Sequence, residues 1–154
     1  MAENLNYKTS SGSWCYDNNS NCYTYGRLYD LNTAMKICPV GWRLPTNRDW
    51  DILVTTAGGS EMAGKKLKST IGWIKNGNDT GGNGTDEYGF LALPGGFYSH
   101  RAGGYGSVGR WGYWWTATKD ELGWGVYRAM SFIFDDVYEG RDYSGGLSVR
   151  CVKE

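Results

Sequence analysis

The sequence has no net charge, a single histidine and no long apolar run. Sixteen basic residues balance sixteen acidic ones, and no cluster of Lys or Arg forms the footprint that binds phosphate backbones. No apolar stretch approaches the roughly 20 residues that cross a bilayer, and the N-terminus lacks the pattern of a secretion signal. We therefore expect no nucleic-acid partner and no membrane insertion, and any export signal would lie outside this sequence.

Residues that build long helices are also scarce, whereas glycine and large aromatic residues are abundant. The chain of 154 residues contains 24 Gly, 12 Tyr and 8 Trp but few Leu, Ala and Glu. This composition favours extended structure with long ordered loops, and the aromatic content argues against disorder. The length predicts a single domain over residues 1–154.

The four cysteines lack the CxxC spacing and the neighbouring histidine of a zinc site. Three pairings are open to Cys15, Cys22, Cys38 and Cys151, and we prefer two of the possible bridges. Cys15–Cys22 would close a short polar loop, and Cys38–Cys151 would tie the C-terminal strand to the early helical region. Such disulfides imply an extracellular or cell-surface location; the alternative is four buried thiols in a cytosolic protein.

Two to three short helices are expected in the first half of the chain. Apolar residues at helical spacing before Pro39 predict a helix that ends near Ile37. Thr46 and Asp49 form a capping-box-like start, and a stripe of Trp50, Leu53, Val54 and Ala57 runs from there to Gly58. A third helical turn is expected over residues 61–67.

The second half reads as short strands. Residues 147–152 alternate apolar and polar side chains, which predicts a strand with one buried face. Trp114 and Trp115 are neighbours in another extended run, so one indole should enter the core while the other faces outward. Helices early and strands late favour an α+β fold with a mostly antiparallel sheet. The expected strands cover residues 90–93, 96–99, 113–118, 125–134 and 147–152.

The sequence resembles the Fibrobacter succinogenes major paralogous domain family, FISUMP, over nearly its whole length. The motifs that carry the resemblance occur in the family's order. They are MAENLNY at 1–7, CYD at 15–17, YGRLY at 25–29, CPVGWRLPT at 38–46, GTDEYGF at 84–90, LPGG at 93–96, YWWTAT at 113–118 and SVRCVK at 148–153.

The resemblance implies a C-type-lectin-like fold, with two to three short helices packed on small twisted antiparallel sheets and long ordered loops as the ligand face. The termini should lie close together, which suits the Cys38–Cys151 pairing. Family domains usually begin one strand earlier, so we expect that strand to be missing here. The family implies bacterial secreted or cell-surface proteins with roles in carbohydrate binding or adhesion, but it supplies no ligand.

The richest candidate site is an aromatic and arginine-containing segment between residues 95 and 143. Sugars stack their C–H faces on Trp and Tyr rings and need polar groups at the ring edge. About half of the rings should be core, and we expect Tyr98, Tyr105, Trp111 and Tyr138 to be the exposed members. The ligand-binding candidates are Tyr98, His100, Arg101, Tyr105, Arg110, Trp111, Tyr113, Tyr138 and Arg141, with Trp124, Tyr127, Arg128 and Tyr143 as further members of the surface.

A loop over residues 76–87 faintly resembles an EF-hand loop. Its weak calcium candidates are Asn78, Asp79, Asp86 and Glu87, but the first position is Asn and no long helices flank it. A hydrated turn is the better interpretation, so we expect no metal and no cofactor.

Catalysis is not expected. Asp135 and Asp136 diverge on an extended chain and do not face each other across a cleft, and His100 has no recognisable nucleophile nearby. Arg27, Arg43 and Arg150 are interpreted as structural hydrogen-bond anchors. The sequence predicts a non-catalytic extracellular module that binds a surface glycan or a plant or bacterial polysaccharide; the alternative is a protein-binding adhesin or a structural cell-surface module.

Overall fold

The computed structural model describes residues 1–75, 82–142 and 144–154, and its architecture is α+β as expected. Within these residues, four short helices accompany an eight-stranded sheet and a two-stranded sheet. The elements in chain order are β1 (Ser13–Trp14), α1 (Asn21–Tyr25), β2 (Leu28–Tyr29), α2 (Leu31–Ala34), β3 (Trp42–Arg43), α3 (Asn47–Thr56), α4 (Ser60–Leu67), β4 (Phe97–Ser99), β5 (Gly104–Gly106), β6 (Trp111–Lys119), β7 (Gly125–Ser131), β8 (Tyr138–Asp142), β9 (Gly145–Ser148) and β10 (Val152–Lys153).

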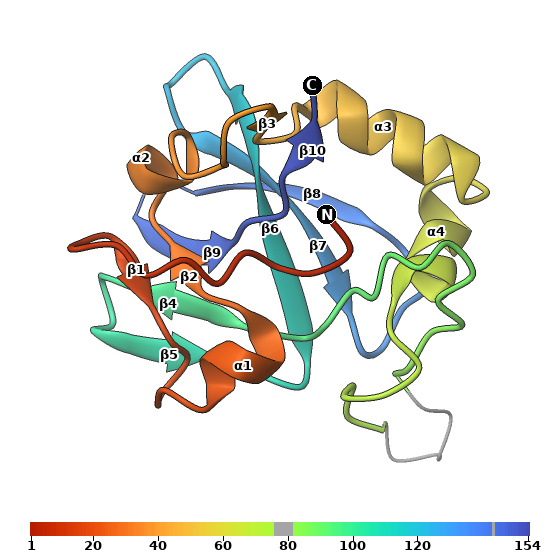
Figure 1. Ribbon diagram of the computed structural model, residues 1–154. Helices are drawn as coiled ribbons and strands as arrows, with labels where there is room; N and C mark the ends of the chain where they lie inside the picture. Colours follow the sequence, from red (N-terminus) through yellow and green to blue (C-terminus); the bar gives the residue numbers. More distant parts are fainter. Residues whose placement is uncertain (76–81, 143) are drawn as a thin grey trace.

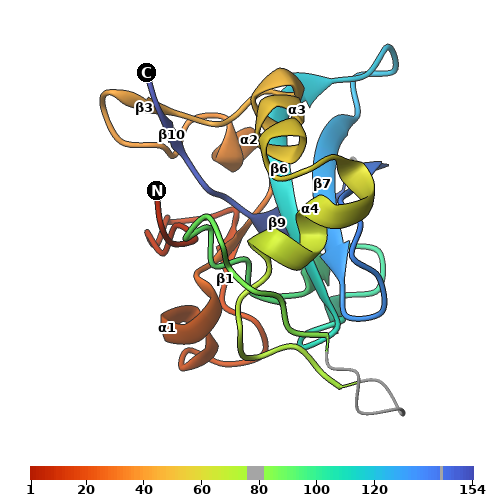
Figure 2. The same cartoon turned by 90° about the vertical axis from the view of Figure 1, so that its right-hand side faces the viewer.

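Strand β6 lies at the centre of the larger sheet, whose main order is β1-β2-β9-β6-β7-β8. The β4–β5 ribbon joins this sheet through β9, while β10 pairs separately with β3. Helices α3 and α4 lie on one side of β6 and β7 in both views (Figures 1 and 2). All described pairings between strands are antiparallel except that of β6 with β9. Instead of several small antiparallel sheets, as expected, most strands therefore form one larger mixed sheet.

The two neighbouring tryptophans of β6 correct one expectation. Trp114 and Trp115 point to opposite faces, as a strand requires, but both are 0% exposed. Trp114 packs with Trp50 in the core under α3 and α4, and Trp115 packs with Tyr29 in a second core on the other face. The prediction that one indole faces outward was therefore wrong, because residues distant in sequence cover both faces of this central strand.

Helix α3 confirms the capping-box prediction. The Thr46 hydroxyl accepts a hydrogen bond from the Asp49 backbone N–H, and the Asp49 carboxylate accepts one from the Thr46 N–H. These bonds satisfy backbone donors that have no partner within the helix. Trp50 and Val54 are buried against the sheet, so the predicted apolar stripe is the face that holds α3 in place.

Other expected helix boundaries differ from the structure. The first expected helix is shorter, since α2 ends at Ala34 and the chain then turns so that Ile37 and Cys38 pack on the second core. The third covers residues 60–67 as α4, close to its predicted range. Helix α1, which begins at the end of the Cys15–Cys22 loop, was not predicted because it is a five-residue segment with a single buried residue, Cys22.

Two expected strands also differ. Residues 90–93 form only an isolated bridge between Lys68 and Ala92. Residues 147–152 divide into β9 and β10, because the carbonyl of Val149 accepts a hydrogen bond from the Leu5 N–H of the N-terminal segment. Ser148 and Arg150 are buried as well, so this stretch does not have the single buried face that its alternation predicted.

Two of the three arginine anchors are supported by the contacts. Arg43 makes a bidentate pair with Asp49 at 2.6 and 2.9 Å. The buried Arg150 donates to Asn4 Oδ1 at 2.9 Å and to the carbonyl of Phe90, and it thereby joins the N-terminal segment to the C-terminal one. Burial lowers the pKa of Arg150 to about 10. The buried Nε of Arg27, by contrast, has no hydrogen-bond partner among the described residues.

Both predicted disulfides are present. Cys15 bonds to Cys22 and Cys38 bonds to Cys151, and no cysteine of the chain is free. The second bridge lies in the core beside Tyr29 and Trp115. The N-terminal amino group donates to the Cys151 carbonyl at 2.9 Å, so the two ends of the chain lie together (Figure 1). None of the helices in the described residues is long and apolar enough to span a bilayer.

The two bridges should stabilise the protein unequally, because they span 113 and 7 positions. In the chain-entropy model, the double variant Cys38→Ala/Cys151→Ala should lose about 5 kcal/mol of unfolding free energy, and Cys15→Ala/Cys22→Ala about 2 kcal/mol. Urea unfolding followed by tryptophan fluorescence measures both losses. Equal losses would contradict the entropic account of the long bridge.

Candidate functional site

A line of partly buried aromatic rings crosses the sheet face opposite α3 and α4. Tyr113 lies at its middle: its ring is 5.7 Å from Phe97, 5.7 Å from Trp111 and 5.6 Å from Tyr127. Trp111 and Tyr113 are stacked, whereas the other contacts are edge-on or tilted, the geometries that aromatic pairs prefer. Tyr138 continues the line 5.6 Å beyond Trp111, and Phe134 ends it. We call these six residues the aromatic strip.

Small residues on the neighbouring strands make room for the strip. Ala129 of β7 is paired with Tyr113 on one side and with Tyr138 on the other. Gly140 is the cross-strand partner of Tyr127, and a Cβ at this glycine would collide with the tyrosine ring. A Cβ at Gly106 would likewise lie 2.8 Å from the ring of its partner Phe97. The high glycine content thus serves close packing of rings across strands.

The centre of the strip is more buried than its ends. Burial, with the neighbouring Tyr127, raises the pKa of Tyr113 to about 12. Burial also raises the pKa values of Tyr127 and Tyr138. All three phenols are neutral hydrogen-bonding groups at physiological pH, which suits the hydroxyl groups of a sugar.

A second group of rings lies on the other face of the β4–β5 ribbon. Trp14 stacks on Tyr98 at 4.6 Å, and His100 meets both rings edge-on. Tyr105 contacts Tyr98 and is 36% exposed. We call these residues, together with Tyr16, the outer cluster. Of the four rings expected to be exposed, Tyr105 is, while Tyr98, Trp111 and Tyr138 are only partly exposed.

A hollow of about 350 Å³ lies where three strand connections converge, beside Phe97 of the strip. Trp124 is 39% exposed in this hollow. It therefore combines an accessible indole with charged and hydroxyl groups, the mixture that small-molecule sites typically show. We call it the Trp124 hollow; its lining residues are Phe97, Tyr98, Ser99, Arg101, Trp124, Asp142, Ser144 and Gly145.

Two of the predicted arginines lie away from the strip. Arg110 is next to the ring of Phe132, which packs on the core under the helices. Arg141 pairs with Glu139 at 2.7 Å, on the side of β8 opposite Tyr138. The pKa of Glu139 is held below its usual range by its hydrogen bond from Asn47 and by its pairing with Arg141.

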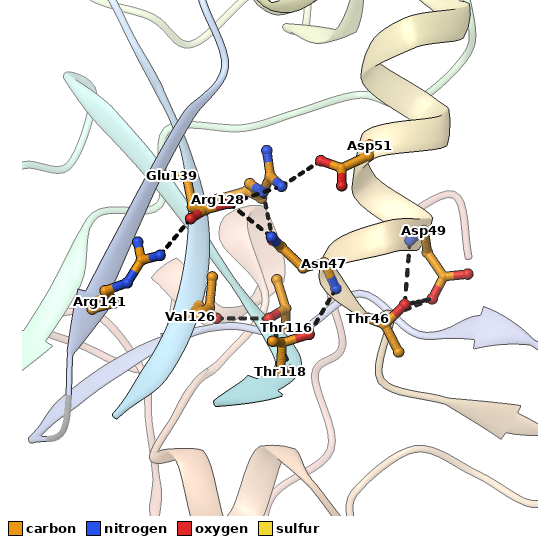
Figure 3. Close-up of polar contacts among 10 residues, drawn as sticks. All are labelled: Thr46, Asn47, Asp49, Asp51, Thr116, Thr118, Val126, Arg128, Glu139 and Arg141. Carbon is orange, nitrogen blue, oxygen red and sulfur yellow. Dashed lines mark hydrogen bonds and ion pairs between the residues drawn. The ribbon is translucent and has the colours of Figure 1, made fainter. Parts of the chain in front are cut away.

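Figure 3 shows that this pair belongs to a polar network that anchors α3 to the sheet. The buried Arg128 donates to Asp51 at 2.6 Å and to Asn47 at 2.9 Å, and its guanidinium is 3.1 Å from Glu139. The Asn47 backbone N–H also donates a hydrogen bond to the Thr118 hydroxyl at 3.0 Å. Arg128 and Arg141 therefore have structural partners, and neither faces the rings of the strip.

The structure thus divides the predicted site. Trp111, Tyr113 and Tyr138 come together in the strip, Arg101 lines the adjoining hollow, and Tyr98, His100 and Tyr105 form the outer cluster. Sequence reasoning missed four members of these groups: Phe97, Phe134, Trp14 and Tyr16. The alternation of Phe97 and Tyr98 on β4 was a usable signal, since neighbouring residues on a strand must face opposite sides.

The weak calcium candidates do not form a site within the described residues. Asn78 and Asp79 lie outside those residues. Asp86 accepts a hydrogen bond from the Leu91 N–H, and Glu87 bonds to Thr85 and lies 3.6 Å from Lys66. Among the residues that the structure describes, no group of three or more His, Cys, Asp or Glu side chains could hold a metal ion.

Comparison with protein-family models matches residues 1–153 to the Fibrobacter succinogenes major domain. The match covers almost the whole chain, in agreement with the sequence motifs. Searches of curated proteins and of solved structures find no match.

The raised pKa of Tyr113 predicts a specific alkaline effect. A phenol that ionises near pH 10 in the unfolded chain and near pH 12 in the folded one stabilises the fold below pH 10, and this contribution is lost as the pH rises to 12. Tyr113→Phe removes it. Between pH 9 and 11.5, the wild type should therefore lose about 1–2 kcal/mol more unfolding free energy than the variant. Parallel pH profiles from urea unfolding would show that Tyr113 is not buried as described.

Proposed function

Because the chain belongs to the Fibrobacter succinogenes major domain family, we propose that it is a non-catalytic extracellular module that binds a polysaccharide along the aromatic strip. The family is bacterial, and it does not specify the ligand. The proposal therefore depends on the geometry of the strip and of the Trp124 hollow at its end.

The observation that carries the proposal is the run of rings from Phe97 through Tyr113 and Trp111 to Tyr138. Successive centroids lie 5.6–5.7 Å apart, a spacing comparable to the length of one sugar unit in a chain. Sugar rings present apolar C–H faces that can pack on such a line, while their hydroxyls need polar partners. Phenol hydroxyls along the strip, with the Ser144 hydroxyl in the adjoining hollow, are suitable partners.

The contacts of the acidic residues support a role without catalysis. Glycoside hydrolysis uses two carboxyl groups that face each other across the scissile bond. Here Asp135 is within 3.5 Å of the buried Lys68, and Glu139 pairs with Arg128 and Arg141 on the face away from the strip. These carboxylates are used separately to hold the fold.

The two disulfides support an extracellular location, since such bonds persist in oxidising compartments. The proposal also includes the C-type-lectin-like arrangement that the sequence motifs imply. It is supported by the adjacent chain ends and by the bridge from the region after α2 to the C-terminal segment.

One observation favours the alternative of a protein-binding adhesin. Ile133 and Phe134 are each 52% exposed at the Tyr138 end of the strip. Exposed apolar side chains that continue an aromatic surface are typical of contacts between proteins. In that case the same face would be used, but the partner would bury Phe134 and its neighbours.

Removing rings from the strip should weaken glycan binding without unfolding the domain. Trp111→Ala and Tyr138→Ala each remove a partly exposed ring, so each should weaken binding about tenfold or more and change the melting temperature by only a few degrees. Tyr23→Ala is the matched control, because Tyr23 is 88% exposed on α1 outside both ring groups. Titration of a panel of soluble plant and bacterial oligosaccharides by calorimetry measures the affinities.

Tyr105→Ala distinguishes the two groups of rings. If this variant loses binding while Trp111→Ala and Tyr138→Ala retain it, the outer cluster is the site and the strip is not. If the wild type binds no glycan of the panel, the polysaccharide proposal fails and the protein-binding alternative takes its place.

A further inference from the structure

A second hollow, of about 300 Å³, adjoins the Trp124 hollow. The two share Ser144 and Gly145 as lining residues. His100 lines one and Arg101 the other; Gly123 lines one and Trp124 the other. Both hollows are therefore lined by residues of the β4–β5, β6–β7 and β8–β9 connections, and the second is also lined by Asp30, Leu31 and Asn32 at the start of α2. We call the second one the Lys119 hollow.

The carboxylates in these hollows are committed to the protein's own backbone. Asp30, in the Lys119 hollow, caps α2 by accepting the Thr33 N–H at 2.7 Å. Asp142, in the Trp124 hollow, accepts the Ser144 N–H at 3.0 Å, and its other oxygen lies against Gly145. Neither side chain can turn into the space without giving up a backbone donor.

The basic groups of the Lys119 hollow are arranged differently. Lys119 and His100 are both exposed there, and Lys119 forms no ion pair with any residue that the structure describes. Asn32 adds an exposed amide. The hollow therefore offers the Lys119 cation and the polar side chains of His100 and Asn32, beside the Asp30 carboxylate that caps α2.

We infer that the Lys119 hollow binds the carboxylate of an acidic sugar residue, so that the ligand of the strip is a chain containing uronic acid. This inference rests on the proposed function, because it places the acidic residue next to the end of the strip. The sugar ring lies over Trp124 and Phe97, its carboxylate reaches across Ser144 to Lys119, and Asn32 and His100 donate to its oxygens. The hollow accommodates one carboxylate of such a chain, since a single lysine lines it.

The test compares two forms of one chain. Oligogalacturonate carries charged carboxylates, whereas its fully methyl-esterified form carries neutral methyl esters on the same sugar chain. The wild type should bind the acidic form about threefold or more tightly, and raising the salt concentration should remove this preference. Lys119→Gln should lose the preference, because its affinity for the acidic form falls to that for the esterified form. Lys153→Gln, a charge-matched change on β10, is the control and should keep the preference.

The outcomes separate this inference from the proposed function. If both forms bind equally, or if Lys119→Gln keeps the preference for the acid, the acidic subsite is refuted while polysaccharide binding stands. If the preference is lost equally in Lys119→Gln and Lys153→Gln, it reflects overall charge and the subsite is again refuted. If neither form binds, and neutral oligosaccharides also fail to bind, both proposals are contradicted.

Discussion

The burial of Trp114 and Trp115 on opposite faces of one strand is the constraint on which the rest of the structure depends. Each indole N–H has a specific partner: Trp114 donates to Asn4 at 2.9 Å and Trp115 to the Tyr29 carbonyl at 2.7 Å. These two bonds stabilise the arrangement, because a buried donor left unpaired costs about 1–3 kcal/mol. Strand β6 therefore fixes the N-terminal segment, β2 and both cores at once. The middle of β6 is buried on both faces. The aromatic side chains of this strand that remain partly exposed are therefore Trp111 and Tyr113.

Glycine and aromatic residues act together in this fold. Rings on one strand lie across glycines on the next, as Tyr127 does over Gly140 and Phe97 over Gly106. Trp14 is close to Gly146 in the same way. A sheet built like this can hold many large rings without burying all of them, which is how a domain with few long helices acquires an aromatic face. The polar network around Arg128 has a different role, since it fastens α3 to the face opposite the strip.

The sequence predicted those features that depend on contacts between residues close together in the chain. The capping box of α3 was readable because Thr46 and Asp49 bond within one turn, and the pairing of Cys15 with Cys22 because their separation is short. The sequence did not predict that β6 and residues 147–151 are buried on both faces. The residues that cover them come from distant parts of the chain. The sequence identified most of the aromatic residues of the candidate site but not how the structure groups them. The rings between residues 95 and 143 were identified, yet only the pairing of strands decides that Phe97 joins the strip while Tyr98 joins the outer cluster.

The most direct test of the central claim uses the indole N–H resonances of the eight tryptophans. These signals can be assigned by single Trp→Phe changes in a nitrogen-15-labelled protein and followed while the tightest-binding oligosaccharide is added. The account predicts that the signals of Trp111 and Trp124 shift with ligand, whereas those of the buried Trp50, Trp114 and Trp115 stay in place. A shift of Trp14 with no change at Trp111 or Trp124 would place the ligand on the outer cluster and contradict the account.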